Sequence, residues 1–272
     1  MKYKAIALDL DGTLKTSDKQ ILKETKEMLI SLAKEGILII LASGRPTAGL
    51  FKEAKELELD KSSGYLLSFN GARVVKYPTM DVVYEKTFTS DIACAIYDHA
   101  KEYHLAVMTY SDEAIITEDS DDCYVQEEGD INHMPLKKVD SFKENIGGPI
   151  HKVLLTAEPE YAAKVVEEFK QPYGDSLSIY RSAPFFIEVM AQNVDKAESL
   201  QMLLNKLNLT KEELIAFGDG YNDLSMIAFA GFGVAMDNAV EEVKQRADYI
   251  TDSNDQNGIA KCLQMLKEKG EI

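Results

Sequence analysis

Two aspartates stand two residues apart near the start of the chain, in the pentapeptide Asp9–Thr13, directly after the apolar run 5–8. This run lacks polar alternation, which predicts a buried strand of a parallel sheet. Carboxylates at the end of such a strand are costly to hold there without a cation. The first hypothesis is therefore a magnesium-dependent aspartyl nucleophile, and the alternative is an Asp-Gly turn between two elements.

A second group of acids follows another apolar run far along the chain, in the loop 218–223 that contains Asp219 and Asp223. The carboxyl ends of neighbouring parallel strands meet at one edge of a sheet, so this loop could share a cation with Asp9. Magnesium prefers oxygen ligands, and two carboxylates, a carbonyl and a phosphate would suit it. The alternative is a glycine-rich turn in which Asp223 caps the next helix.

Two further positions could hold a phosphate. Ser43 and Gly44 end a predicted strand, where a hydroxyl and an amide ahead of a helix could bind a phosphate oxygen. Lys196 lies near the amino end of a predicted helix that Asn193 could cap, and its ammonium would be a point charge for the phosphate. The alternatives are an ordinary strand-to-helix turn and a solvated surface lysine.

The elements that must position these residues alternate between strands and helices. Helical spacing over residues 19–35 ends at Gly36, a natural left-handed cap, and β-branched apolar runs flank this helix. Near residue 80 the pattern changes to an α+β layer, and from about residue 194 the first pattern returns. The sequence predicts an α/β fold, a Rossmann-like doubly wound parallel-sheet core over 1–80 and 191–272 with an inserted α+β cap domain over 81–190.

Composition narrows the classes of partner. The 272 residues are 45% apolar and 28% charged, with a net charge of -16, which disfavours nucleic acid or an anionic membrane surface as a partner. The three cysteines form no Cys-x-x-Cys pair, and no apolar run is long enough to cross a bilayer. We expect a cytoplasmic protein whose partners are small molecules, and no motif indicates an oligomeric state.

The negative charge is concentrated in the predicted cap. Residues 81–190 contain 22 acids against 9 lysines and arginines, a balance of -13 that leaves -3 for the core. Such a cap would disfavour substrates with anionic groups beyond the transferred phosphate, which favours a sugar or polyol monophosphate or a phosphorylated amine. The alternative is a solvated face that keeps the protein in solution.

Taken together, these motifs resemble the haloacid dehalogenase superfamily of phosphatases, and more narrowly its Cof-type branch, in which an α/β cap interrupts the core after the third strand. The residues that carry the resemblance are Asp9–Thr13, Ser43–Pro46, Phe69–Ala72, Lys196, Gly218–Asp223, Gly233–Met236, Asn238, Ala239, Asn254, Asn257 and Gly258. The cap matches this branch only in its pattern of elements.

The resemblance implies that the substrate is a small phosphorylated metabolite, and it implies a mechanism. Asp9 would be the nucleophile that forms an aspartyl-phosphate, and Asp11 would protonate the leaving oxygen and then activate water. Mg²⁺ would be held by the Asp9 carboxylate, the Asp11 carbonyl and the Asp219 carboxylate.

The resemblance also implies roles for the residues around this centre. The phosphate-binding residues would be Leu10, Ser43, Gly44, Lys196 and Asn222. Thr13 and Asp223 would support the centre, and Arg45, Asn70 and Arg181 would be candidates for contacting the leaving group.

Two other functions stay open at this point. Related enzymes with similar caps are phosphomutases, which return the phosphoryl group to a sugar rather than to water. A non-catalytic sensor of a phosphorylated ligand would also pair strand-end acids with magnesium and a lysine. The sensor explains Asp11 and a large inserted cap less well than an enzyme does.

Overall fold

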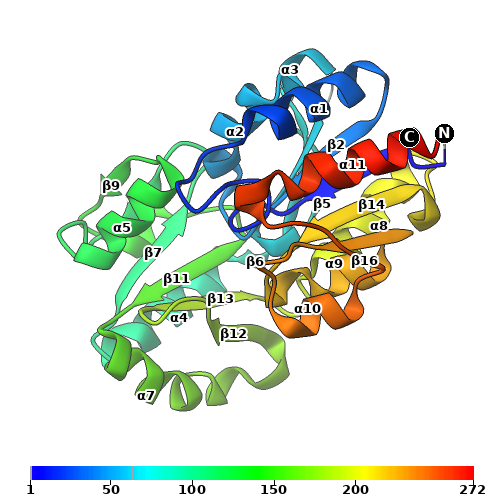
Figure 1. The fold of residues 1–272 in the computed structure, drawn as a ribbon. Coiled ribbons are helices and arrows are strands. Elements are labelled where there is room, and N and C mark those ends of the chain that lie inside the picture. The colour runs from blue at the N-terminus through cyan, green and yellow to red at the C-terminus, as the bar shows by residue number, and fades with distance from the viewer. Residues whose placement is uncertain (1, 63) are drawn as a thin grey trace. The chain divides into compact units, whose positions relative to one another are not determined.

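The computed structural model describes residues 2–62 and 64–272 and divides the chain into two compact units. One unit takes the chain up to Glu85 and resumes at Asp195, and the other holds Lys86–Val194. Figure 1 shows this interruption by colour, because segments from both ends of the colour bar make up the first unit. Within the described ranges, no helix combines the length and apolar character that crossing a bilayer requires.

The first unit is built on one eight-stranded sheet. Its strands are β1 (Ala5–Leu8), β2 (Leu38–Ala42), β3 (Gly64–Ser68), β4 (Arg73–Tyr77), β5 (Asp81–Glu85), β14 (Leu214–Gly218), β15 (Phe232–Ala235) and β16 (Tyr249–Ile250). Their order is β16-β15-β14-β1-β2-β3-β4-β5, in which β4 runs antiparallel to both β3 and β5 and all other neighbours are parallel. The predicted parallel-sheet core is confirmed, and Asp81–Glu85, the first five residues of the predicted cap, pair within this sheet.

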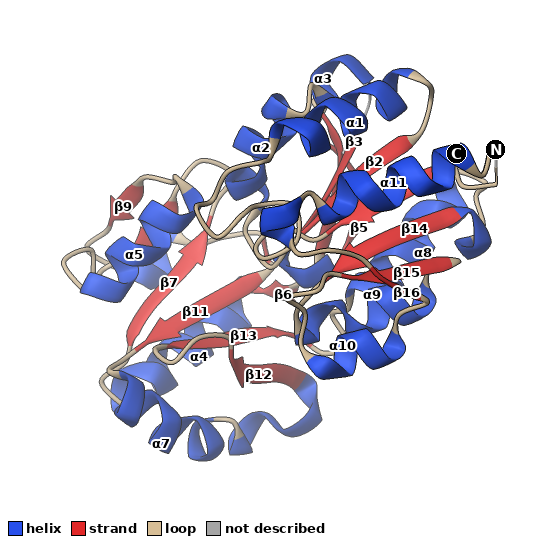
Figure 2. Cartoon of the chain, in the orientation of Figure 1, coloured by secondary structure: helices blue, strands red, loops and turns tan. Residues whose placement is uncertain are grey.

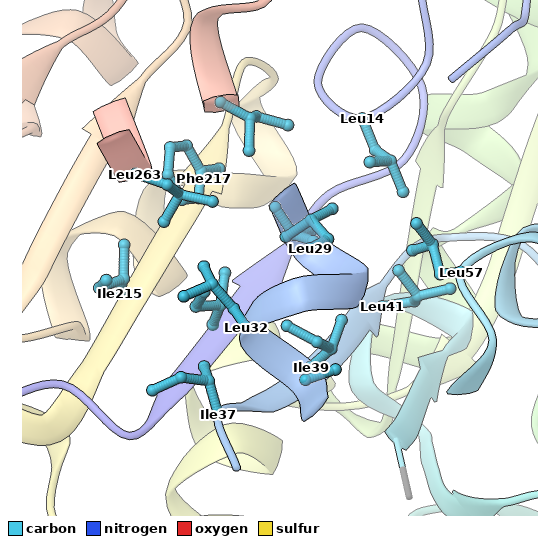
Figure 3. Packing of buried hydrophobic residues seen from close by; sticks show 14 of the residues in the cluster. Leu14, Leu29, Leu32, Ile37, Ile39, Leu41, Leu57, Ile215, Phe217 and Leu263 are labelled. Atoms are coloured by element: carbon cyan, nitrogen blue, oxygen red, sulfur yellow. The ribbon is translucent and has the colours of Figure 1, made fainter. Parts of the chain in front are cut away.

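Helices cover both faces of this sheet. They are α1 (Lys23–Lys34), α2 (Phe51–Glu56), α3 (Leu59–Ser62) and α11 (Gly258–Glu268) on one face, and α8 (Lys196–Lys206), α9 (Leu224–Phe229) and α10 (Glu241–Arg246) on the other. In Figure 3, Leu29 and Leu32 of α1 lie among strand residues such as Ile39 and Phe217. Burial on both faces explains why these strands read as continuous apolar runs.

The second unit packs helices against a mostly antiparallel sheet, as the sequence predicts (Figure 2). The sheet order is β12-β13-β11-β7-β8-β9, and only β8 and β9 pair in parallel. Its strands are β7 (Ala106–Tyr110), β8 (Ile115–Thr117), β9 (Leu136–Lys138), β11 (Lys152–Thr156), β12 (Leu177–Arg181) and β13 (Phe186–Ala191), and β6 (Phe88–Thr89) pairs separately with β10 (Pro149–Ile150). The helices are α4 (Ser90–Glu102), α5 (Cys123–Asn132), α6 (Phe142–Asn145) and α7 (Pro159–Phe169).

Candidate active site

The predicted site residues of the first unit lie on loops at one edge of its sheet. β1 pairs in parallel with both β2 and β14, and Leu8 is in register with Leu41 and Phe217. The chain proceeds from β1 to β2 and β3 on one side, and β14, β15 and β16 lie on the other. Crevices for ligands form at the carboxyl ends of strands where the strand order reverses in this way. The loops after β1, β2 and β14 therefore meet where the sequence predicts chemistry.

Lys196 joins three of these loops through its ammonium group. Its Nζ donates to Asp9 Oδ1 at 2.6 Å, to Asp223 Oδ1 at 2.6 Å and to the Ala42 carbonyl at 3.0 Å. The side chain is almost fully buried, and each of its three hydrogens has an acceptor. Burial favours the neutral amine, but the carboxylates of Asp223 and Asp9 hold the pKa of Lys196 above its usual range. Lys196 is therefore a permanent buried cation rather than a surface lysine.

The helix that carries Lys196 is capped by a residue other than the one predicted. Asp195 is the N-cap of α8, and its side chain accepts from the amides of Ala197 and Glu198. Asn193 lies two residues earlier with a left-handed backbone, φ +56°, so the predicted Asn193 cap is wrong. The cap fixes the first turn of α8 and with it the direction of the lysine.

Three carboxylates gather beside this cation. Asp9, Asp219 and Asp223 each place one oxygen within 4.8 Å of the others. Burial, reinforced by the Asp223 charge, raises the pKa of Asp9 well above its ordinary range, and burial raises the pKa of Asp219 to about 6. A divalent cation among these oxygens would favour the ionised form of each acid, so the all-oxygen donor set fits a hard divalent cation.

Asp223 arranges the loop after β14. Its Oδ2 accepts from the amides of Asp219 at 3.0 Å and Gly220 at 2.9 Å, while its Oδ1 faces Lys196. A side chain at Gly218 would place its Cβ 2.5 Å from the Asp223 Cβ, so this approach requires glycine. Asp223 thus orients the Asp219 loop and binds Lys196, and its carboxylate also belongs to the acidic cluster.

Two residues of the first motif also hold Asp219. The Thr13 hydroxyl donates to Asp219 Oδ1 at 2.6 Å. Gly12 has φ +87°, and a Cβ there would lie 2.3 Å from Asp219 Oδ2. Leu10 is fully buried, and its carbonyl accepts from the Lys15 amide. The loop after β1 therefore closes tightly against the loop after β14.

The Asp11 side chain has a different partner from Asp9. Arg45 donates from Nε to Oδ2 and from Nη2 to Oδ1 of Asp11, both at 2.8 Å. Burial acts to raise the pKa of Asp11, but the Arg45 guanidinium outweighs it and lowers the pKa below its ordinary value. Among the described residues, Asp11 is not one of the acids that cluster, so the structure brings its carboxylate to Arg45.

Hydroxyl and amide groups extend the site along the loops after β2, β3 and β14. Ser43 Oγ accepts from the Arg45 amide at 3.2 Å, and the Ser43 carbonyl accepts from the Asn70 amide at 2.9 Å. Asn222 Nδ2 donates to Asn70 Oδ1 at 3.2 Å, and a Cβ at Gly44 would meet the Asn70 amide group at 3.1 Å. The structure therefore brings Ser43, Gly44, Asn70 and Asn222 together.

Arg181 is the one predicted site residue that lies in the second unit. It ends β12, its side chain is exposed, and its Nη2 donates to the Pro184 carbonyl at 3.0 Å. This contact stabilises the turn between β12 and β13. A role in substrate binding stays a prediction for Arg181.

Two asparagines hold the first loop, and sequence reasoning assigned neither of them a role. Asn238 Nδ2 donates to the Gly12 carbonyl at 2.8 Å, and Asn254 Nδ2 donates to the Lys15 carbonyl at 2.8 Å. Asn238 Oδ1 accepts from the main-chain amide of Asn254 at 3.1 Å, so the two contacts belong to one hydrogen-bond network. Both residues were among those that carry the family resemblance, which was the available signal.

Comparisons with known proteins show the family of this chain. The chain matches the haloacid dehalogenase-like hydrolase family over residues 6–263. It is 42% identical to a haloacid dehalogenase-like hydrolase from Bacteroides thetaiotaomicron, whose crystal structure superposes with a TM-score of 0.94 over 97% of this chain and 100% of that one. A HAD subclass IIB sugar phosphatase is 26% identical, with a TM-score of 0.78 over 99% of this chain and 100% of its own. The 5-amino-6-(5-phospho-D-ribitylamino)uracil phosphatase YitU of Bacillus subtilis is 30% identical, covering 95% of each chain.

Proposed function

The chain belongs to the family of haloacid dehalogenase-like hydrolases, and from that premise we propose that it is a magnesium-dependent phosphatase that acts through an aspartyl-phosphate. As a member of this family with relatives named as phosphatases, it is a phosphoric monoester hydrolase. One observation carries the finer proposal. The Lys196 ammonium is bound at 2.6 Å to both Asp9 and Asp223, and both acids cluster with Asp219.

Asp9, Asp219 and the main-chain carbonyl of Asp11 would hold Mg²⁺. Bound there, the ion would offset the repulsion between an anionic nucleophile and an anionic phosphate. Lys196 supports the same end, because its ammonium holds one oxygen of Asp9 and keeps positive charge beside the reacting phosphoryl group. The hydroxyl of Ser43, the Gly44 amide and Asn222 would bind the phosphoryl oxygens.

In the first chemical step an oxygen of Asp9 attacks phosphorus as the bond from phosphorus to the alcohol oxygen breaks. Asp11, in its protonated form, gives its proton to the departing oxygen. In the second step water attacks phosphorus, Asp11 accepts a proton from that water, and the bond from phosphorus to Asp9 breaks. The enzyme is restored, and inorganic phosphate and the free alcohol are the products.

The contact between Arg45 and Asp11 bears on this cycle. Arg45 lowers the pKa of Asp11 and so favours the carboxylate form, which suits the base of the second step. The first step needs Asp11 to carry a proton. We therefore infer that Arg45 loosens its hold on Asp11 when the substrate binds and binds it again for water attack.

A sugar or polyol monophosphate is the substrate class that we propose. The negative balance of residues 81–190 supports a substrate with no second anionic group. Two relatives support the same class by their names, one a sugar phosphatase and one a phosphatase for a phosphoribitylamino compound. The cap would then select the leaving group while the first unit performs the chemistry.

The test is phosphate release from a panel of sugar and polyol monophosphates and their bisphosphates, with Mg²⁺ or with excess EDTA. We expect release that requires Mg²⁺, disappears in Asp9→Asn and favours monophosphates. Release that survives EDTA would contradict the metal proposal, and a clear preference for bisphosphates would contradict the substrate class. Conversion of a hexose 1-phosphate to the 6-phosphate with little free phosphate would instead identify a phosphomutase.

A further inference from the structure

A buried ion pair lies outside the set of site residues. Lys15 Nζ lies 2.8 Å from Glu53 Oε1, and the two residues are only 3% and 2% exposed. Lys15 follows the pentapeptide Asp9–Thr13 by two positions, and Glu53 lies on α2. The pair therefore connects the loop that carries Asp9 and Asp11 to a helix that packs on the sheet.

Stability alone is a poor explanation for this pair. Removing two charges from water is repaid only when every polar atom finds a good partner. Glu53 Oε2 is buried and has no hydrogen-bond partner among the described residues. Neutral side chains of similar size would pack in the same space without the cost of burying two charges.

The backbone of Lys15 is fixed independently of its side chain. Its amide donates to the Leu10 carbonyl at 2.9 Å, and its carbonyl accepts from Asn254 at 2.8 Å. Lys15 also forms a β-bridge with Asp11. The side chain extends from this backbone into the interior and binds Glu53. The ion pair therefore attaches the loop independently of its backbone hydrogen bonds.

Glu53 holds Lys15 from a helix whose Ala54 is fully buried in the core of the first unit. The ion pair therefore attaches the loop to an element that is itself fixed by packing.

We propose that Lys15 and Glu53 are positioning residues for the catalytic loop: Glu53 anchors Lys15, and the anchored loop keeps the backbone at Asp9 and Asp11 in one geometry through both steps of phosphoryl transfer. This inference rests on the proposed function, since it assigns the pair to the reaction of Asp9 and Asp11. Neither residue touches the substrate, and the effect is on kcat rather than on substrate affinity.

The test compares the wild type with the neutral double variant Lys15→Met/Glu53→Gln, using a good substrate from the panel. We expect a kcat lower by about tenfold, with a KM within about twofold and a melting temperature close to that of the wild type. Lys15→Arg keeps the ion pair and should retain most of the wild-type kcat. A double variant that folds and keeps the wild-type kcat overturns the inference.

A matched control uses an exposed ion pair that ends on the same helix. Lys26 Nζ and Glu56 Oε1 are 3.3 Å apart, and both side chains are partly exposed. Lys26→Met/Glu56→Gln should leave kcat unchanged. If this control lowered kcat as much as Lys15→Met/Glu53→Gln does, the loss would be a general effect of disturbing α2 and would not support a specific role for the buried pair.

Hydrogen exchange separates failure of this inference from failure of the proposed function. The amides of Leu14 and Lys15 donate to the carbonyls of Asp9 and Leu10, so loosening the loop should speed their exchange in Lys15→Met/Glu53→Gln. This readout needs no turnover. A wild type without phosphatase activity would refute the proposed function, and equal exchange rates in the two proteins would refute the anchor.

Discussion

Arg45 binds both oxygens of Asp11 with its guanidinium, although the sequence suggested that it contacts the leaving group. A planar guanidinium fits a carboxylate in this two-bonded geometry, which a lysine cannot reproduce. At the scale of single residues, the site thus has two charged pairs with separate duties. Lys196 holds Asp9, the proposed nucleophile, and Arg45 holds Asp11, the proposed proton carrier.

Arg45→Met should therefore lower kcat while leaving KM little changed, because it removes a group that orients Asp11 rather than one that binds substrate. A loss of about tenfold to a hundredfold is expected, and Arg45→Lys should recover only a small part of it. Steady-state kinetics measures both constants. Arg246→Met, at an exposed position, is the control. A raised KM with an unchanged kcat would instead support the leaving-group contact.

At the scale of elements, the sequence predicted most of what carries the site. Continuous apolar runs located the parallel strands, and the motifs at their carboxyl ends located Asp9, Ser43 and Asp219. The sequence could not predict the partner of Asp11, because the guanidinium of Arg45 suits a phosphate and a carboxylate equally well. The ion pair of Lys15 and Glu53 could not be predicted either, since 38 positions separate the two residues and no local sequence pattern relates them.

The helix α5 (Cys123–Asn132) was not predicted. It lies in a segment with nine acids between Asp112 and Asp130, and it includes Gly129, which weakens helices. A local N-cap and the burial of one face stabilise it instead. Asp122 caps the helix by accepting from the amides of Tyr124 and Val125, and Val125 is fully buried. The sequence shows the cap residue, but not the tertiary contacts that bury Val125.

Glu128 on α5 should make the stability of the second unit depend on pH. Its carboxyl group accepts from the Tyr110 hydroxyl at 2.6 Å, and burial raises its pKa above the ordinary 4.5. An acid with a raised pKa in the folded state favours folding most when it is protonated. The contribution of Glu128 to the free energy of unfolding is complete below pH 4.5, the ordinary pKa, and is lost as the pH rises through the raised pKa of the folded state.

Glu128→Gln keeps an acceptor for Tyr110 and cannot ionise. We expect its melting temperature to exceed that of the wild type by more at about pH 8 than at about pH 5. Glu127→Gln, on the exposed side of the same helix, should show no such trend. Parallel curves for Glu128→Gln and the wild type would mean that Glu128 does not titrate in this way.

At the scale of the whole molecule, the segment that returns from the second unit leads directly to Lys196. The chain leaves the first unit at Glu85 and returns at Asp195, which caps α8, and the next residue is Lys196. Lys86 Nζ donates to the Asn193 carbonyl at 2.8 Å, so the outgoing and returning segments are tied together. The first helical residue after the second unit is therefore Lys196, the buried cation that binds Asp9 and Asp223 of the acidic cluster.

The central claim is that Asp9, held by Lys196, is the group that receives the phosphoryl group. Its most direct test is rapid acid quenching of the working enzyme, followed by mass spectrometry of the peptide that contains Asp9. We predict one phosphoryl group on Asp9 during turnover, and none in Asp9→Asn, which should remain folded without turning over substrate. Turnover with no phosphoryl group on Asp9, or with one on another residue, would contradict the account.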